Sequence, residues 1–556
     1  MFERMLKKLA NACWFIPGVL LWASFPPMQE KTDVLFALAP LMWLARNSGS
    51  GKSCRLWFLN GLVFWVATLA WMPAIVKNGG PWPLVVLGWF VLACYLSLYF
   101  LAFGFLSSSY WTFARGRSYL FRLAGILLVE PVLWGGLELV RSNLFGGFAW
   151  NQLGVCMVNA NYGAPSSVGG VYLCSIVVVL INGTIASIAD RVISSMIPQR
   201  KVNDTIKTPH GEFEIKEVEK PAPVYKVPRI LRSMETFIPF ALIFLIFKIS
   251  SHPVALPTDG KNFDPLPVAI VQRNFPCVFS SGRYENPREE YSRLLLNLST
   301  LKPELLVLPE SAFAEIGALD GKNAEEFAGF LASKTNAKWI MAGGGRRDSM
   351  NRDFNSAALY AMSTNKVKSV QLYDKVHLVP FGEYIPGDKT ITALQKLAPV
   401  GSCTPGKLKI LELNGVKVGV AICYEDTDSS QIRALAKMGA NMLVFITNDS
   451  WFSDSDEALQ HYWQCVSRAI ETGLPVVRVG NSGVSGFISP SGQSNLMVNS
   501  DGQPLLDAKG TMFDFVRPRA ARSLYLKLGD WPLAVLFAAV LFAVQIYGDF
   551  AGYSCI

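Results

Sequence analysis

The segment VGVAICYED at residues 418–426 carries the strongest structural signal in this chain. Its first five residues are apolar, and the turn-forming pair Asn414-Gly415 stands shortly before it, so the segment predicts a buried β-strand that ends at Ile422. Cys423 follows that strand, with acidic residues just beyond it, where α/β folds place reactive groups. The alternative is a structural thiol, because free cysteine is among the most buried residue types.

The composition of the chain indicates apolar membrane segments and one soluble domain. Of its 556 residues, 51% are hydrophobic and only 17% are charged, compared with about 25% charged in soluble proteins. The apolar residues gather in long blocks in the first half and again near the C-terminal end, whereas residues 265–520 have the charge and turn density of a soluble domain. We therefore predict a transmembrane bundle over residues 1–250, one soluble domain over 265–520, and a C-terminal transmembrane helix over 529–549.

A helix needs about 20 apolar residues to cross a bilayer. The candidate spans, about seven of them in the N-terminal bundle, are residues 12–25, 34–45, 57–76, 82–106, 120–140, 167–189, 235–250 and 530–548. The first, second and seventh of these are short. A polar and charged segment at about 190–233 separates the sixth span from the seventh and is expected to be a cytoplasmic loop.

Lys and Arg residues set the expected orientation, because cytoplasmic loops are enriched in them. They occur at the N-terminus and after the second, fourth and sixth spans, while the intervening loops contain few. This alternation places the N-terminus in the cytoplasm and the soluble domain outside, provided that the seventh span is real; without it the domain would change sides. The aromatic segment 145–150 then falls on the outer side, where aromatic residues mark the membrane interface.

Charge and cysteine usage exclude several classes of function. The net charge of +9 does not indicate a nucleic-acid partner, because many basic residues lie in the loops between spans. The ten cysteines show no CxxC spacing and no Cys/His cluster, so no metal and no cofactor is predicted. In an extracytoplasmic domain a disulfide such as Cys277–Cys403 is allowed, but the sequence does not determine it.

Short apolar runs alternate with helical patterns through residues 265–520, which predicts an α/β layered domain. The runs begin at Val268, Leu305, Trp339, Val418, Met442 and Val476. Helical patterns occupy residues 325–334 and 430–438.

Three polar residues at the ends of these runs could act together. Glu310 follows the second run, Lys375 lies in the polar and aromatic segment 373–384, and Cys423 follows the strand described above. Glu310 could take the thiol proton, and Lys375 could stabilise the thiolate and the charge that develops on an attacked carbonyl, which is acyl transfer through a thioester. The plainer alternatives are an acid at a helix N-terminus for Glu310 and a surface lysine for Lys375, and spacing alone does not bring the three together.

The motifs Pro309-Glu310-Ser311, Tyr373-Asp374-Lys375 and Cys423-Tyr424-Glu425 resemble the Glu–Lys–Cys triad of the nitrilase superfamily. With the spans and the motifs at 381–384, 448–452 and 529–532, the chain resembles the apolipoprotein N-acyltransferase family of bacterial inner membranes over essentially its whole length. The resemblance implies a multi-pass α-helical membrane bundle with an extracytoplasmic, periplasmic α/β nitrilase-like domain, an αββα sandwich. It also implies transfer of an acyl chain from a phospholipid to the α-amine of the N-terminal diacylglyceryl-cysteine of an apolipoprotein, by a ping-pong route through a thioester.

The same resemblance implies roles for individual residues. Cys423 is the nucleophile, Glu310 the base and Lys375 the oxyanion stabiliser. The residues that support the active site are Glu383, Tyr424 and Glu425, and those expected to contact lipid are Trp451, Phe381 and Tyr384. The family tends to carry a tryptophan in the loop after Gln272, which is absent here; Phe279 or Tyr284 could substitute for it.

The expected partners are a phospholipid donor, a diacylated apolipoprotein acceptor and membrane lipids, with no nucleic acid and no cofactor, and the enzyme is expected to be a monomer. A membrane-tethered nitrilase-type amidase that hydrolyses small amides would use the same triad with water as acceptor, and a non-catalytic scaffold would need none of it. Two lipid substrates favour the transferase, because a membrane bundle beside the site and an apolar cavity keep water from the thioester.

Overall fold

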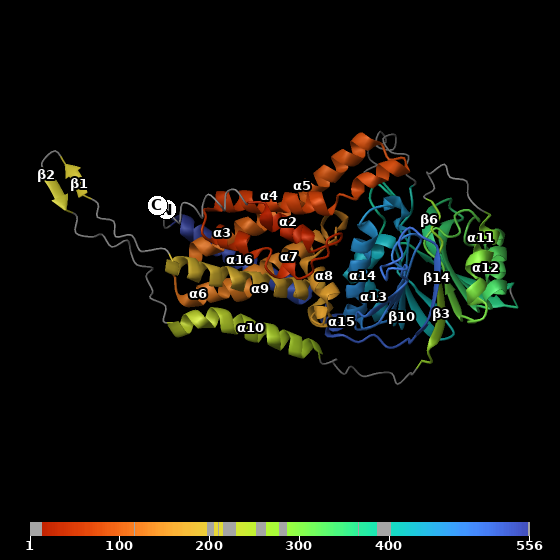
Figure 1. The fold of residues 1–556 in the computed structure, drawn as a ribbon. Helices are drawn as coiled ribbons and strands as arrows, with labels where there is room; N and C mark the ends of the chain where they lie inside the picture. Colours follow the sequence, from red (N-terminus) through yellow and green to blue (C-terminus); the bar gives the residue numbers. More distant parts are fainter. Residues whose placement is uncertain are drawn as a thin grey trace.

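The computed structural model describes residues 14–115, 117–196, 205–208, 211–214, 229–251, 263–276, 286–364, 366–385 and 402–553. A helical bundle occupies one end of the molecule and a layered α/β domain the other (Figure 1). Between α9 and α10, within the expected loop, β1 Thr205–Thr208 pairs with β2 Gly211–Glu214 as an antiparallel hairpin.

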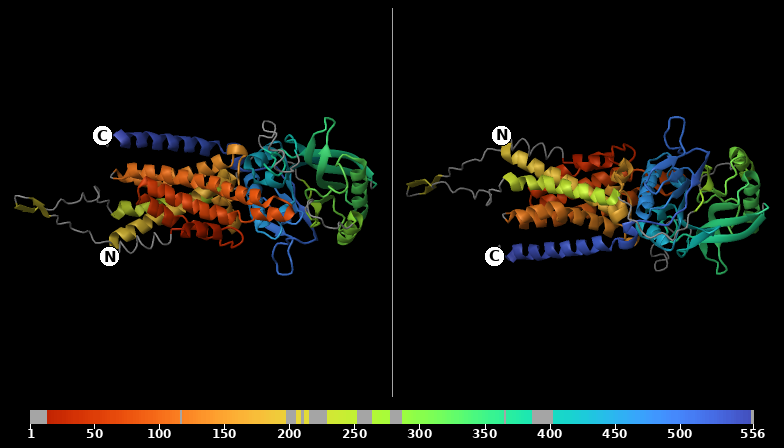
Figure 2. Two further views of the ribbon diagram at one scale, coloured as in Figure 1. Left: turned by 90° about the horizontal axis from the view of Figure 1, so that it is seen from above. Right: turned by 90° about the horizontal axis from the view of Figure 1, so that it is seen from below.

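The bundle is built from long apolar helices. Among the described residues, five helical segments are long and apolar enough to cross a membrane, and α16 is a further apolar helix near the C-terminal end. The helices are α4 Ser50–Thr68, α5 Trp82–Ala114, α6 Tyr119–Ala124 running through a π-turn into α7 Glu130–Arg141, α9 Ser166–Met196, α10 Arg229–Ser251 and α16 Trp531–Tyr553. The weak seventh candidate is therefore a helix of spanning length, and α16 runs back along α5 and α7 (Figure 2).

The first two predicted spans, 12–25 and 34–45, are wrong as single spanning helices within the described residues. α2 Ile16–Ala23 and α3 Ala39–Arg46 have eight residues each, about 12 Å of helix, against a hydrocarbon core of about 30 Å. Buried amides from longer helices satisfy the backbone at their ends. Asn60 Oδ1 accepts from the Gly18 N–H, and Asn182 Oδ1 accepts from the Leu38 N–H, each at 2.9 Å. Such internal partners are what allow interrupted helices inside a bundle.

The α/β domain contains two six-stranded sheets. The first has the order β14-β3-β4-β5-β6-β7 and the second β13-β12-β11-β10-β9-β8. In chain order the strands are β3 Leu266–Gln272, β4 Leu305–Val307, β5 Trp339–Arg347, β6 Asp353–Ser363, β7 Lys366–Asp374, β8 Ile410–Leu413, β9 Val416–Ile422, β10 Met442–Thr447, β11 Val476–Gly480, β12 Gly486–Ile488, β13 Ser494–Leu496 and β14 Gly510–Val516. The helices are α11 Pro287–Leu294, α12 Lys322–Thr335, α13 Ser429–Lys437, α14 Glu457–Thr472 and α15 Leu524–Leu528.

The two sheets pack face to face through alternate side chains. Val268 and Ile270 of β3 point into the core between the sheets, together with Val420 of β9. Ala269 between them points the other way, into a second core with Phe327 of α12. Because the central strands β3 and β4 are buried on both faces, they are apolar at nearly every position. The predicted αββα sandwich is confirmed.

Helix α14 lies between the second sheet and the membrane bundle (Figure 1). Trp463 and Val466 of α14 share one continuous apolar core with Phe445 of β10 and with Cys156 and Tyr172 of the bundle. Every residue of α14 except Leu459 is buried, as expected for a helix that is covered on all sides. The domain is therefore built directly onto the bundle.

Candidate active site

The strand directions bring three predicted residues to one edge of the sandwich. β4 and β5 are parallel, β6 is antiparallel to both of its neighbours, and β7 therefore runs in the direction of β4. Glu310 follows the carboxyl end of β4, and Lys375 follows that of β7. Cys423 follows the carboxyl end of β9 in the facing sheet, and the charges of both other residues act on its thiol. The structure thus places the three groups in one site.

The nucleophile candidate sits on a strained turn. Cys423 has φ +54°, in the left-handed region that residues with a side chain seldom adopt, and it begins a short 3₁₀ turn, Cys423–Thr427. Ser311, directly after Glu310, has φ +60°. Strain of this kind costs about 1–3 kcal/mol at each position and persists only where the surroundings hold it in place.

Glu310, Lys375 and Glu383 form a cluster that Asn355 of β6 completes. The Lys375 Nζ lies 2.9 Å from Glu383 Oε2 and 4.0 Å from Glu310 Oε1. The Asn355 Nδ2 donates to Glu310 Oε1 and to Glu383 Oε1, at 2.7 Å each. Asn355 was missed in the sequence because it lies inside a strand rather than after one, and no motif marks it.

Burial and neighbouring charges shift the pKa values of Cys423, Glu310 and Lys375. Burial and the charge of Glu310 raise the pKa of the Cys423 thiol well above its ordinary value, against the opposing effect of Lys375. Burial also raises the pKa of Glu310, which Lys375 partly offsets. Burial lowers the pKa of the Lys375 ammonium, but the neighbouring negative charges, first that of Glu383, outweigh burial and raise it. The resting site therefore holds a thiol beside a weakly acidic carboxyl group and a permanent cation.

The Glu383 carboxylate supplies the counterion for that cation. Burial would raise the pKa of Glu383, but the charge of Lys375 and hydrogen bonds from Asn355 and the Val379 N–H lower it overall. Because Glu383 is ionised, Glu310 is left to exchange protons with the thiol.

Glu425 connects the segment after β7 to the end of β9. Its Oε1 accepts from the Val376 N–H at 2.7 Å and the His377 N–H at 3.1 Å, and its Oε2 accepts from the Ile422 N–H at 2.8 Å. The Tyr373 hydroxyl donates to the same carboxylate, at 3.1 and 3.0 Å. One buried side chain thus fixes the residue after Lys375 and the residue before Cys423.

Tyr424 connects the turn that begins at Cys423 to the membrane bundle. Its ring stacks on Trp150 at 6.4 Å between centroids with planes 14° apart, and on Phe148 at 6.4 Å and 28°. Its hydroxyl donates to the Gly147 carbonyl at 3.3 Å. The expectation that residues 145–150 mark the membrane interface is therefore wrong for Trp150, which is 3% exposed and packs against the active site.

Of the three residues expected to contact lipid, two lie in the turn that carries Glu383 and one lies in the turn after β10. Phe381 is 68% exposed and has φ +62°, in a tight turn where its N–H donates to the Tyr384 carbonyl at 2.7 Å. Tyr384 is half-buried, and this turn also carries Glu383. Trp451, also half-buried, lies in the turn after β10, and its carbonyl accepts from Asn78 Nδ2 of the bundle at 2.8 Å.

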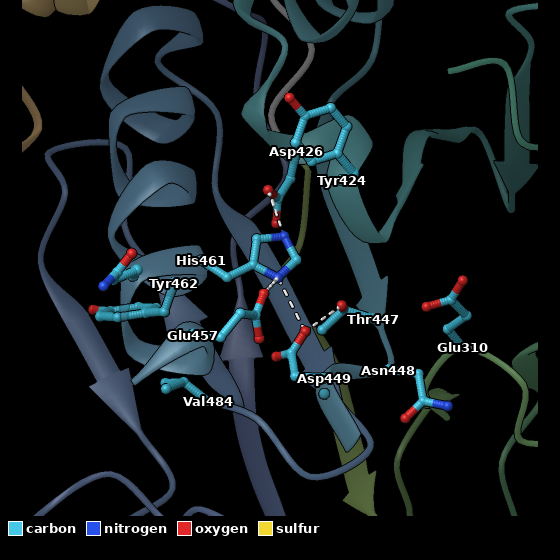
Figure 3. A network of polar contacts seen from close by, with 12 residues as sticks. Glu310, Tyr424, Asp426, Thr447, Asn448, Asp449, Glu457, His461, Tyr462 and Val484 are labelled. Carbon is cyan, nitrogen blue, oxygen red and sulfur yellow. Dashed lines mark hydrogen bonds and ion pairs between the residues drawn. The ribbon is translucent and has the colours of Figure 1, made fainter. Parts of the chain in front are cut away.

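A buried polar cluster lies beside the nucleophile turn (Figure 3). Asp449, Glu457 and His461 have ligand atoms within 4.8 Å of one another, a spacing that a metal ion could use. The Arg478 guanidinium, however, already lies 3.6 Å from Asp449 Oδ2, and both ring nitrogens of His461 face carboxylate oxygens. The donor set therefore fits an ion-pair network better than a metal site.

Some predictions concern residues outside the described part of the chain. Cys277, Phe279 and Tyr284 are among these, so neither the disulfide with Cys403 nor the substitute for the missing tryptophan is tested.

Comparison with known proteins covers both parts of the chain. Residues 17–184 match a family model described as the apolipoprotein N-acyltransferase N-terminal domain, and residues 293–510 match one described as carbon-nitrogen hydrolase. An apolipoprotein N-acyltransferase from Geobacter metallireducens is 27% identical, with 93% of this chain and 91% of that protein covered. The protein of the same name from Photobacterium profundum is 25% identical, with 93% and 90% covered. Among solved structures, an amidase from Nesterenkonia sp. is 17% identical over 50% of this chain and 98% of that chain, with a TM-score of 0.34.

Proposed function

This chain belongs to the apolipoprotein N-acyltransferase family, and on that premise we propose that it transfers a fatty acyl chain from a membrane phospholipid to the α-amino group of the N-terminal diacylglyceryl-cysteine of apolipoproteins. One observation carries the proposal: Cys423 shares a site with Glu310 and Lys375, and the residue next to it, Tyr424, stacks on the membrane bundle. A nucleophile for lipid substrates has to be reached from the membrane, and this one is built against it.

The first half-reaction forms a thioester. Glu310 takes the proton of the Cys423 thiol as the sulfur attacks an ester carbonyl of the phospholipid. The Lys375 ammonium stabilises the negative charge on the carbonyl oxygen of the tetrahedral intermediate. As the ester C–O bond breaks, Glu310 returns its proton to the leaving oxygen, and a lysophospholipid departs.

The second half-reaction reverses these roles. The α-amine of the diacylated cysteine attacks the thioester carbonyl, and Glu310 accepts a proton from the amine nitrogen. The C–S bond then breaks, the sulfur regains a proton from Glu310, and the product is an amide. Water competes with the amine, so the aromatic cover of Tyr424 and Trp150 favours transfer over hydrolysis.

The same proposal assigns the supporting residues. Glu383 holds Lys375 in place as its counterion, and Glu425 and Tyr424 position the nucleophile turn. Exposed Phe381, with Tyr384 and Trp451, contacts the lipid substrates. The enzyme acts as a monomer, without a cofactor, in a bacterial inner membrane.

Orientation follows from the distribution of Lys and Arg and from α10. The helix α10 is of spanning length, so it counts as a crossing that precedes the domain. With this crossing included, the domain lies on the side of the membrane opposite the basic loops. This supports a periplasmic position for the domain, as proposed.

Intact-protein mass spectrometry tests the function. The purified full chain is mixed with phosphatidylethanolamine vesicles and then with a synthetic diacylated lipopeptide. One acyl mass is expected on Cys423, followed by its transfer to the peptide amine, and Cys423→Ala abolishes both. Full transfer by Cys423→Ala would refute the proposal. Hydrolysis of small soluble amides without acyl transfer would instead favour the membrane-tethered amidase.

A further inference from the structure

The ring of His461 in α14 is held between carboxylates from two active-site segments (Figure 3). Its Nε2 lies 3.1 Å from Asp426 Oδ1, in the turn that begins at Cys423, and its Nδ1 lies 3.0 Å from Asp449 Oδ1, in the turn after β10. We propose that His461 is a positioning residue for acyl transfer, which clamps the turn of Cys423 to the segment after β10. This inference rests on the function proposed above.

The geometry requires a charged ring. An ionised carboxylate only accepts hydrogen bonds, whereas a neutral imidazole has a single N–H. The Nδ1 contact with Asp449 is a hydrogen bond, and Nε2 lies 3.1 Å from Asp426 Oδ1 as an ion pair, so only the doubly protonated ring turns an N–H toward both carboxylates. In agreement, burial lowers the pKa of His461, but Asp426 and Asp449 outweigh burial and raise it to about 10. The clamp is therefore closed at neutral pH.

The groups that face this ring balance its charge. Arg478 of β11 lies 3.7 Å from Asp426 Oδ2 and 3.6 Å from Asp449 Oδ2. Glu457, one turn earlier in α14, lies 3.7 Å from His461 Nδ1, and burial together with Asp449 raises its pKa well above the ordinary value, so it keeps its proton. Two carboxylates thus face two cations, with one neutral acid. Loss of the imidazolium would leave a buried, uncompensated negative charge.

The clamp acts on the part of the site that is most strained. Asp426 lies in the 3₁₀ turn that starts at Cys423, whose φ of +54° has to be enforced by its surroundings. On the other side, Asp449 is fixed by the Thr447 hydroxyl at 2.7 Å, at the end of β10. No contact of His461 with the Glu310–Lys375–Cys423 group is seen among the described residues, so it acts through the turn and not on the substrate.

The membrane bundle covers the clamp. The Trp150 ring lies 5.6 Å from the His461 ring and also stacks on Tyr424. The Trp150 Nε1 donates to the Gln460 side chain at 2.9 Å, next to His461 in α14. The Trp150 side chain therefore excludes water from both the clamp and the flank of the nucleophile. Because Trp150 belongs to the membrane bundle, the experiment requires the full chain.

The test compares His461→Gln with wild type in two assays. The first measures kcat and KM for N-acylation of a diacylated lipopeptide in phosphatidylethanolamine vesicles. The second measures alkylation of Cys423 by iodoacetamide, per folded molecule, by peptide mass spectrometry. We expect kcat to fall by about a hundredfold, the effect of a small misplacement of a reacting group, while KM is retained. The extent of Cys423 alkylation per folded molecule is expected to differ between His461→Gln and wild type. A loss of stability alone would not produce this difference, because only folded molecules are compared.

Two further variants keep the test decisive. Glu457→Gln mimics the protonated acid and should retain kcat and Cys423 alkylation. Asp426→Asn combined with His461→Gln restores charge balance without the clamp, and should recover thermal stability but not kcat. Wild-type kcat in His461→Gln, an equal loss in Glu457→Gln, or recovery of kcat in the double variant would each overturn the proposal.

The two proposals fail in different ways. If wild type does not transfer acyl groups but His461→Gln still alters Cys423 alkylation, the proposed function is refuted and the clamp stands. If wild type transfers acyl groups and alkylation is the same in both proteins, the clamp is refuted and the function stands.

Discussion

Replacing Glu425 by glutamine should slow the enzyme without unfolding it. Oε1 of Glu425 accepts two backbone N–H groups, from Val376 and His377, and Oε2 accepts that of Ile422. A glutamine can keep its oxygen toward the first two, but its NH₂ group then faces the Ile422 N–H. One buried donor loses its acceptor, which costs about 1–3 kcal/mol.

That cost falls on the residue directly before Cys423. We expect the free energy of unfolding to drop by about 2 kcal/mol, and the rate of thioester formation to fall by about ten- to a hundredfold because the sulfur is displaced. Single-turnover mass spectrometry of the acyl-enzyme gives the rate, and thermal unfolding of the same sample gives the stability. The matched control is Glu326→Gln, because Glu326 is 57% exposed and its ion pair with Lys322 is 3.8 Å long, so it should change neither.

A wild-type rate in Glu425→Gln would refute this reasoning. Burial raises the pKa of Glu425, so a protonated carboxyl group is the competing description, and glutamine would mimic it. The four donors that converge on the carboxylate argue for the ionised form, and the experiment separates the two descriptions.

Three further predictions follow from single contacts. Asn355→Ala removes the amide shared by Glu310 and Glu383, and should lower the rate of thioester formation by about tenfold with KM for phospholipid unchanged; an unaffected rate would contradict it. Because burial raises the pKa of Glu310 above 4.5 and the base must be ionised to accept the thiol proton, the rate should rise with pH through that raised pKa, and an acid limb at or below pH 4.5 would be inconsistent. The pKa of His377 is raised above 6.5, first by its hydrogen bond to Asp428, so their pairing should contribute about 0.5–1 kcal/mol below pH 6.5 and lose it as pH rises through the raised pKa. The unfolding free energies of wild type and His377→Gln should therefore converge at high pH.

The strand ends were predictable because burial and chemistry leave separate marks on the sequence. An apolar run such as 418–422 marks a strand buried on both faces, and the first polar residue after it marks where the chain leaves the sandwich. Glu310 and Cys423 both occupy that position, and the expected chemistry was assigned to them for that reason. The α/β layering followed from the same runs and the helical patterns between them, whereas the αββα sandwich came from the family resemblance.

Other features depend on contacts between distant parts of the chain, which periodicity does not report. Asn355 lies within β6, where a polar residue reads as solvent-facing, and only the folded site shows that it joins two carboxylates. The short helices α2 and α3 depend on Asn60 and Asn182, far along the chain, to satisfy their backbone. Trp150 is of a residue type that is common at membrane interfaces, but it packs on Tyr424.

Helix α14 explains why the site and the bundle cannot be considered apart. Its polar side chains are buried because their partners come from the membrane part: Gln460 accepts from Trp71 and Trp150, and Glu471 accepts from the Val171 N–H at 2.8 Å. In a domain that stood free in water these groups would sit on a wet outer face, and a polar helix would need no such partners. Here α14 covers the second sheet on one side and packs against the membrane bundle on the other. Its residues also contact the turn that begins at Cys423. The geometry of Cys423 is therefore set in part by the membrane helices, which suits the proposed transfer of an acyl chain between two membrane lipids.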